Sequence, residues 1–148
     1  RGLSVWIAGA ATLHALGMVV LYESVPWWDH LTHLVSGALV AGVGYAFVRT
    51  LDEYSEAVSL NGVFVGVFVV LFTLAAGVLW EVLEMVGREV ARALGMEPIL
   101  VVYGLEDTML DLVVDGLAGL AVAVAGSPFL EGTVTRLTER LRGEGPSD

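Results

Sequence analysis

Two long stretches without a charged residue restrict what this chain can fold into. Residues 2–22 carry no formal charge and a single histidine, and residues 59–80 are wholly uncharged. Each stretch is long enough for an α-helix across a hydrocarbon core of about 30 Å. Residues 33–48 and 112–130 are weaker candidates, because each needs polar residues near one end to complete a span. We therefore predict an all-α polytopic membrane protein, a bundle of four transmembrane helices.

Local signals predict where the helices of this bundle begin and end. The expected helices start near residues 3, 30, 61 and 105, and the first three end near residues 22, 50 and 94. Gly95 and Pro98 should end the third helix, since glycine favours the left-handed conformation after a helix and proline cannot continue one. Tyr22, Trp27 and Trp28 are expected in the aromatic belt where the membrane meets water.

The bundle should occupy residues 1–127 as one unit, and a short amphipathic helix is predicted after it. Residues 128–142 place apolar side chains opposite charged ones, namely Phe129, Val134, Leu137 and Leu141 against Arg136, Glu139, Arg140 and Arg142. Such a pattern fits a helix that lies in the membrane interface. Residues 143–148 are expected to form a disordered tail.

The charged residues are mostly acidic, and this balance excludes several functions. Hydrophobic residues make up 56% of the chain, yet its net charge is -10, with seventeen acidic and seven basic residues. All basic residues are arginines, and the acidity argues against nucleic acid as a partner. An acidic, lysine-free surface suggests a source adapted to high salt, whereas a GC-rich genome would explain the arginines alone. The absence of cysteine excludes disulfides, thiolate metal ligands and thiol catalysis.

The positions of the arginines predict the orientation of the chain in the membrane. With four spans, Arg1, Arg49 and the three arginines near the C-terminus fall on one side, and Arg88 and Arg92 fall on the other. Basic residues favour the cytoplasmic side of a membrane. Both termini and the charged link over residues 51–57 are therefore expected in the cytoplasm of a multi-pass cell-membrane protein.

Three stretches place ionisable side chains at the edges of these apolar runs or inside them. They are residues 27–33 with Asp29, His30 and His33, residues 80–84 with Glu81 and Glu84, and residues 106–115 with Asp107, Asp111 and Asp115. Such groups are costly in a membrane, so they usually face a bundle interior, pair with one another or hold an ion. At a rise of about 1.5 Å per residue, all three stretches reach the extracytoplasmic side of the bundle. Their spacing gives each helix one polar face, which we expect to point inward.

A bound cation is the interpretation that this cluster favours. Repulsion among the carboxylates would be severe in a partly dehydrated bundle without protons or a divalent cation. Inward carboxylates and histidines on neighbouring helices are also how carboxylate-bridged di-metal bundles are built. Oxygen and imidazole ligands favour Zn, Mn or Fe ahead of Ca or Mg. The predicted metal ligands are Asp29, His33, Glu81, Glu84, Asp107 and Asp111.

Three uses of the cluster are compatible with the sequence. A metal centre could activate water or oxygen to act on a lipid or other amphiphile, with Glu84 or Asp111 as general base. The same carboxylates could instead carry protons or cations across the membrane, with Asp115 and His14 continuing the path inward. The third use is a structural network of hydrogen-bonded carboxylates without metal. The lipid bilayer is the expected partner. The sequence is also compatible with a homo-oligomer or with a place in a larger membrane complex.

Four more polar residues are expected behind the ligands or along a path, and they are His14, His30, Thr108 and Asp115. His14 and Asp115 fall at a similar depth, so they either pair or, in the case of His14, bind a hydroxyl or backbone group. His30 lies about 60° around the helix from His33, which favours exposure to interfacial water. Thr108 either donates a hydrogen bond to a ligand or caps the fourth helix.

In these stretches the chain resembles the YjdF-like (DUF2238) family of small integral membrane proteins. The matching residues are Asp29, His33 and Gly37 in the first stretch, Trp80, Glu81 and Glu84 in the second, and Asp107, Thr108 and Asp111 in the third. The similarity covers about residues 27–119. His30 stands where the family commonly has arginine, Leu34 replaces an aromatic residue, and Asp115 lies outside the shared pattern. The resemblance implies a polytopic bundle with a polar cluster, without a substrate or a reaction.

Overall fold

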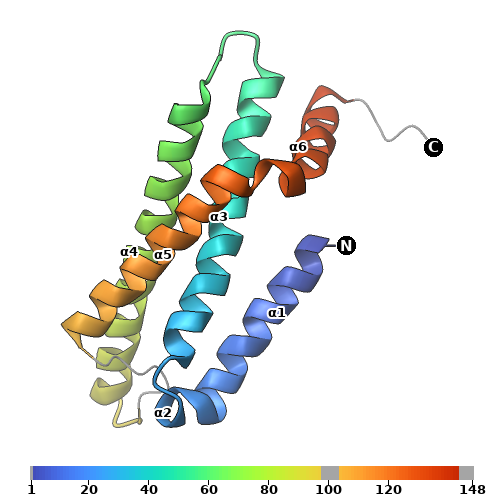
Figure 1. Cartoon of the computed structure of the whole chain (residues 1–148). Coiled ribbons are helices and arrows are strands. Elements are labelled where there is room, and N and C mark those ends of the chain that lie inside the picture. The colour runs from blue at the N-terminus through green and yellow to red at the C-terminus, as the bar shows by residue number, and fades with distance from the viewer. Residues whose placement is uncertain (1, 98–103, 144–148) are drawn as a thin grey trace.

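The computed structural model describes residues 2–97 and 104–143, and every regular element within these ranges is helical (Figure 1). The elements are α1 (Gly2–Leu16), η1 (Gly17–Leu21), α2 (Tyr22–Ser24), α3 (Trp28–Tyr54), α4 (Gly62–Ala93), α5 (Leu105–Ala125) and α6 (Ser127–Arg142). Four helical stretches of the described chain are long and apolar enough to cross a membrane, and they are Ser4–Ser24, Trp28–Tyr54, Gly62–Ala93 and Leu105–Ala125. The predicted all-α fold with four membrane-spanning helices and a further C-terminal helix is confirmed.

The first span is a continuous helix that contains a π-helical turn near its C-terminal end. α1 passes into the π-helical turn η1 and then into α2, so helical backbone continues to Ser24, past the predicted end near residue 22. Gly17 opens this turn, and a Cβ atom there would lie 2.6 Å from the ring of Tyr22. A π turn rotates the side chains that follow it around the helix axis. Tyr22 is accordingly only 9% exposed, so its ring packs inside the bundle. Its place at the depth of the aromatic belt stays a prediction.

The connection between α3 and α4 covers residues 55–61 and thus lies four residues further along the chain than the predicted link over residues 51–57. Arg49 forms ion pairs with Asp52 and Glu53 one turn further along, which extends α3 to Tyr54. The Asp52 carboxylate also accepts a hydrogen bond of 2.8 Å from the backbone N–H of Leu60. These local contacts explain why charged residues at the end of α3 remain helical.

The other helix boundaries agree closely with those predicted from the sequence. The Asn61 side chain accepts a hydrogen bond of 2.8 Å from the Phe64 N–H and caps the start of α4, as the prediction near residue 61 requires. Gly95 has a φ of 70°, the left-handed conformation that ends α4. Pro98, which was predicted to help end this helix, lies outside the described residues. α5 starts at Leu105, as predicted.

Three helices form the centre of the bundle. α3 packs against α4, α5 and α6, α4 packs against α5, and α1 packs against α3. The buried hydrophobic cluster contains Ala41, Tyr45, Ala46, Val48, Val65, Val69 and Val134. Many large apolar side chains of the spanning helices are exposed, for example Val19, Val63 and Val124. An apolar outer surface of this kind is stable in lipid, where helices keep their backbone hydrogen bonds within each segment.

α6 uses part of its apolar face to pack on α3. Val134 is 2% exposed and belongs to the buried cluster, and Arg142 donates a hydrogen bond of 2.7 Å to the backbone oxygen of Glu53. Phe129 and Leu141 remain exposed, so they are available to the membrane interface predicted for residues 128–142. Gly143 ends the helix with a φ of 74°, and the rest of the predicted tail lies outside the described residues.

We expect Val134→Asp to detach α6 from α3, because it places a charge in the buried cluster without a partner. The midpoint of thermal unfolding in detergent should fall by about 5 °C or more. Leu141→Asp is the matched control, since Leu141 is 55% exposed on the same helix. Equal effects of the two substitutions would show that α6 does not pack as described.

Candidate functional site

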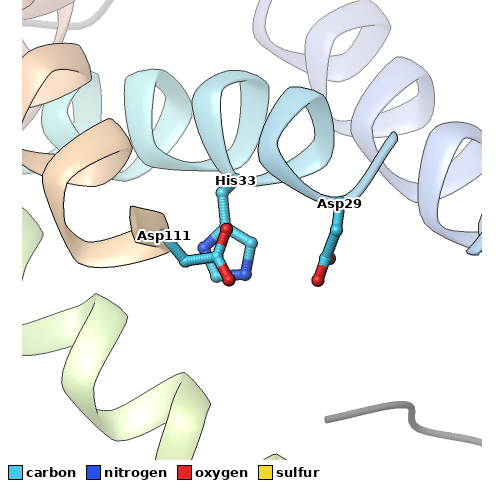
Figure 2. A group of neighbouring side chains, drawn as sticks. All are labelled: Asp29, His33 and Asp111. Atoms are coloured by element: carbon cyan, nitrogen blue, oxygen red, sulfur yellow. The ribbon is translucent and has the colours of Figure 1, made fainter. Parts of the chain in front are cut away.

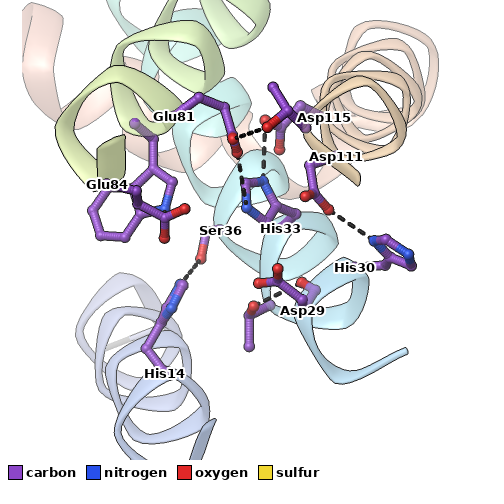
Figure 3. A network of polar contacts seen from close by, with 12 residues as sticks. His14, Asp29, His30, His33, Ser36, Glu81, Glu84, Asp111 and Asp115 are labelled. Carbon is purple, nitrogen blue, oxygen red and sulfur yellow. Dashed lines mark hydrogen bonds and ion pairs between the residues drawn. The ribbon is translucent and has the colours of Figure 1, made fainter. Parts of the chain in front are cut away.

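Ionisable side chains from three helices meet at the end of the bundle nearest α2 (Figure 3). α3 contributes them from its first turns, α4 from its C-terminal half and α5 from its first turns. Asp29, His33, Asp111 and Asp115 are 8%, 5%, 2% and 4% exposed, respectively. Because α3, α4 and α5 pack against one another, their polar faces share one interior. The residues in this cluster are Asp29, His30, His33, Glu81, Glu84, Asp107, Asp111 and Asp115.

Asp29, His33 and Asp111 form the most buried group that could hold a metal ion (Figure 2). Asp29 and His33 lie one turn apart on α3, and Asp111 reaches them from α5. One ligand atom from each residue lies within 4.8 Å of the other two. Two carboxylate oxygens and one imidazole nitrogen are a ligand set that suits Zn, Mn or Fe.

Two carboxylates of this cluster, Asp29 and Glu81, have oxygens without a hydrogen bond among the described residues, and of these oxygens Oε1 of Glu81 is fully buried. Asp29 is 8% exposed, and within the described part of the chain no hydrogen bond reaches its side chain. Only its backbone oxygen is engaged, as acceptor of a 2.7 Å hydrogen bond from Thr32. A buried carboxylate oxygen without a hydrogen bond, such as Oε1 of Glu81, is costly, and a cation is one partner that can offset this cost.

His30, Asp107 and Asp111 form a second group of possible metal ligands. Nδ1 of His30 lies 2.8 Å from Oδ1 of Asp111, so His30 contacts the cluster directly although its side chain is 30% exposed. The sequence favoured water exposure for His30, and the structure shows partial exposure together with this contact. The sequence could not show the contact, because it depends on how α5 packs against α3.

Glu81 and Glu84 lie on the α4 side of the cluster, outside both three-residue groups. Oε2 of Glu81 accepts a hydrogen bond of 2.7 Å from Thr108, and its Oε1 lies 3.6 Å from Nε2 of His33. Thr108 therefore donates to a predicted ligand, while the N-cap position of α5 is Gly104. Trp80 donates a hydrogen bond of 2.9 Å to Glu84. Glu81 thus contacts His33 of α3, whereas the partner of Glu84 is Trp80 on the same helix.

Asp115 occupies a narrow space between α3 and α4 that two glycines create. Its Oδ2 lies 3.4 Å from Nδ1 of His33. A Cβ atom on Gly37 of α3 would lie 2.7 Å from Oδ1 of Asp115, and one on Gly77 of α4 would clash with Oδ2. Sequence reasoning missed Gly77, since only the packing of three helices shows which glycine faces a carboxylate. Asp115 thus holds the imidazole of His33 from the side away from Asp29.

His14 binds two hydroxyl groups, which is the second of the two arrangements expected for it. Its Nδ1 lies 2.8 Å from the Tyr22 hydroxyl, and its Nε2 lies 3.0 Å from the hydroxyl of Ser36. The direct pair with Asp115 does not form, because Asp115 contacts His33 instead. The Tyr22 hydroxyl also lies 3.4 Å from that of Thr32. The π turn that buries Tyr22 therefore ties the first span to α3.

A cavity of about 360 Å³ lies beside the cluster. His33 and Asp115 line it from the cluster side, and His14 lines it from α1. The rest of its wall is mainly apolar, with Leu39, Val40, Ala76 and Trp80 among the lining residues. The ring centroids of His14 and Trp80 lie 5.6 Å apart, so α1 and α4 approach each other at this point. His33 is thus shared between the metal-ligand group and the cavity.

Fold and site together define a class of protein, a polytopic helical membrane protein with a buried carboxylate and histidine cluster at one end. The sequence profile of a family described as predicted membrane protein (DUF2238) matches residues 1–132. The chain belongs to this family, and the resemblance seen in the three polar stretches is confirmed. Comparison with curated proteins and with solved structures gives no match.

Gly77→Ala should push the Asp115 carboxylate away from His33 and destabilise the bundle by about 1–3 kcal/mol, the usual effect of overpacking. Gly66→Ala on the same helix is the control, since its Cβ would only touch Ala123 at 3.8 Å. In an Asp115→Ala background the effect of Gly77→Ala should largely disappear, because the clashing carboxylate is gone. Thermal unfolding of the four variants in detergent measures this coupling, and strictly additive effects would contradict the described packing.

Proposed function

We propose that this protein binds a divalent metal ion through Asp29, His33 and Asp111, with Zn, Mn or Fe the best fit. The observation that carries the proposal is the convergence of Asp29, His33 and Asp111, whose ligand atoms lie within 4.8 Å of one another between α3 and α5. A cation at this point would relieve the repulsion between Asp29 and Asp111. Three protein ligands also leave coordination positions open, as in catalytic rather than purely structural sites.

The remaining predicted ligands surround this triad. Glu81 contacts the His33 ring, so we propose that it orients this ligand or joins the coordination when the ion is bound. Asp107 lies with Asp111 in the second three-residue group. Glu84, which is held by Trp80, remains as a carboxylate for proton transfer, whereas Asp111 is better placed as a ligand than as a general base.

We further propose that the metal centre acts on an amphiphile whose alkyl chain occupies the adjacent cavity. The volume of about 360 Å³ lies at the lower end of the range for small-molecule sites. Its apolar wall lies within the membrane-spanning helices and ends at His33 and Asp115, so a chain bound there would bring its polar group toward the cluster. A bound metal ion at that position would supply a Lewis acid and an activated water.

The arginines support an orientation with this cluster at the extracytoplasmic face and both termini in the cytoplasm. Arg49 lies toward the end of α3 remote from the cluster, and Arg136, Arg140 and Arg142 lie on α6, which packs on that part of α3. Arg88 and Arg92 follow the cluster residues of α4. Basic residues in larger number at the end opposite the cluster favour the cytoplasm there.

Ion translocation has weaker support from the packing. A second cavity of about 250 Å³, with Arg49, Glu53 and Glu131 in its lining, lies on the other side of the hydrophobic core. Val69 is fully buried, one turn from Thr73 in the first cavity and one turn from Val65 in the second. A path through the bundle would have to cross this apolar layer, where an ion is costly. A static polar network without metal leaves Oε1 of Glu81 buried without a hydrogen bond among the described residues.

Metal analysis of protein purified without chelator tests the proposal. Wild-type protein should retain a transition metal, and Asp29→Asn or Asp111→Asn should weaken its binding by about tenfold or more. Glu89→Gln is the control, because Glu89 is an exposed carboxylate of α4 that pairs with Arg92. Metal-free wild-type protein that also binds no added Zn²⁺ or Mn²⁺ would end the metal hypothesis.

The amphiphile hypothesis is tested by filling the cavity. Ala76→Phe should reduce the lipid or detergent that co-purifies with the protein, as measured by mass spectrometry, because the larger ring takes the space of an alkyl chain. Ala75→Phe is the matched control, since Ala75 is exposed on the same helix. Unchanged lipid content in Ala76→Phe, with normal folding by circular dichroism, argues against an alkyl chain in this cavity.

A further inference from the structure

Asp111 belongs to both groups of possible metal ligands. One group joins it to Asp29 and His33, and the other joins it to His30 and Asp107. Figure 3 shows the two imidazoles on opposite sides of the Asp111 carboxylate. A carboxylate has two oxygens with lone pairs in different directions, so it can serve two partners at once.

The two groups have the same chemistry. Each combines the shared carboxylate with one further aspartate and one histidine, and in each group the ligand atoms lie within 4.8 Å of one another. Both groups contain a histidine and an aspartate because the ligands recur at helical spacing. His30 and His33 are three residues apart on α3, and Asp107 and Asp111 are four apart on α5. Both pairs therefore present neighbouring ligands along the same side of their helices.

The charge at this end of the bundle also favours more than one cation. Asp29, Asp107 and Asp111 converge with Glu81, Glu84 and Asp115 in or beside the two groups. A single divalent ion offsets only part of this negative charge. Glu81 shows the same imbalance, since its Oε1 lies 3.6 Å from Nε2 of His33 and is buried without a hydrogen bond among the described residues.

We propose that Asp111 bridges two divalent ions, one held by Asp29 and His33 and the other by His30 and Asp107. This proposal rests on the metal-binding function above and adds a second ion, with His30 as its ligand rather than an exposed interfacial residue. Paired ions of this kind stabilise the attacking and leaving oxygens of phosphoryl or acyl transfer. The substrate class that fits the centre is thus an amphiphile with a phosphate or ester group.

Loading of the protein with Mn²⁺ alone, followed by metal counting and electron paramagnetic resonance, tests this proposal. Wild-type protein should bind two ions and show the spectrum of an exchange-coupled pair. His30→Arg should bind one ion with the hyperfine pattern of isolated Mn²⁺, because arginine can still contact Asp111 but cannot ligate a metal. His30→Asp, which restores an oxygen ligand, should regain the second ion.

The outcomes separate this inference from the metal-binding function itself. Wild-type protein with one uncoupled ion, unchanged in His30→Arg, would overturn the bridge and leave the single metal site intact. Wild-type protein that binds no Mn²⁺ or Zn²⁺ would overturn both. Glu89→Gln should keep both ions, and circular dichroism with size-exclusion chromatography shows that each variant is folded. Two ions retained in folded His30→Arg would exclude His30 as a ligand.

Discussion

The cost of burying carboxylates between membrane-spanning helices is the constraint on which the rest of this structure depends. Asp29, Asp111 and Asp115 are each at least nine-tenths buried, although an ionised group in such a place is stable only with a partner. Asp115 has His33, and Asp111 has His30. An oxygen of Asp29 lies within 4.8 Å of ligand atoms of His33 and Asp111, and Oε1 of Glu81 is buried without a hydrogen bond among the described residues. In the proposed function, a metal ion at the centre of the cluster would offset the negative charge that three helices bring to one point.

The rest of the bundle holds this cluster in place. Gly37 and Gly77 let α3 and α4 approach closely enough for Asp115 to lie between them beside His33. The π turn at η1 places the Tyr22 hydroxyl beside His14, which also reaches Ser36 of α3 and lines the cavity next to the cluster. Beyond it, the apolar core around Val69 closes the interior toward the other end. The cluster thus adjoins the apolar cavity through His33 and Asp115, an arrangement that suits the amphiphile of the proposed function.

Hydrophobic length and polar spacing predicted the fold and the membership of the cluster. The start of α4 at its Asn61 cap, the start of α5 at Leu105 and the convergence of three polar stretches all follow from patterns within single helices. The sequence could not show which cluster residues contact which, because these contacts depend on the rotation of neighbouring helices. The His30 contact with Asp111, the glycine at position 77 and the buried Tyr22 are of this kind. The apolar cavity also arises only from packing.

Anomalous X-ray diffraction from crystals of the protein grown with Mn²⁺ or Zn²⁺ tests the central claim most directly, because it locates the ion itself. The account predicts an anomalous peak between Asp29, His33 and Asp111, at about 2.0–2.2 Å from their ligand atoms. It is contradicted by crystals that show no peak in the cluster, with the Asp29 carboxylate instead bonded to protein groups or water.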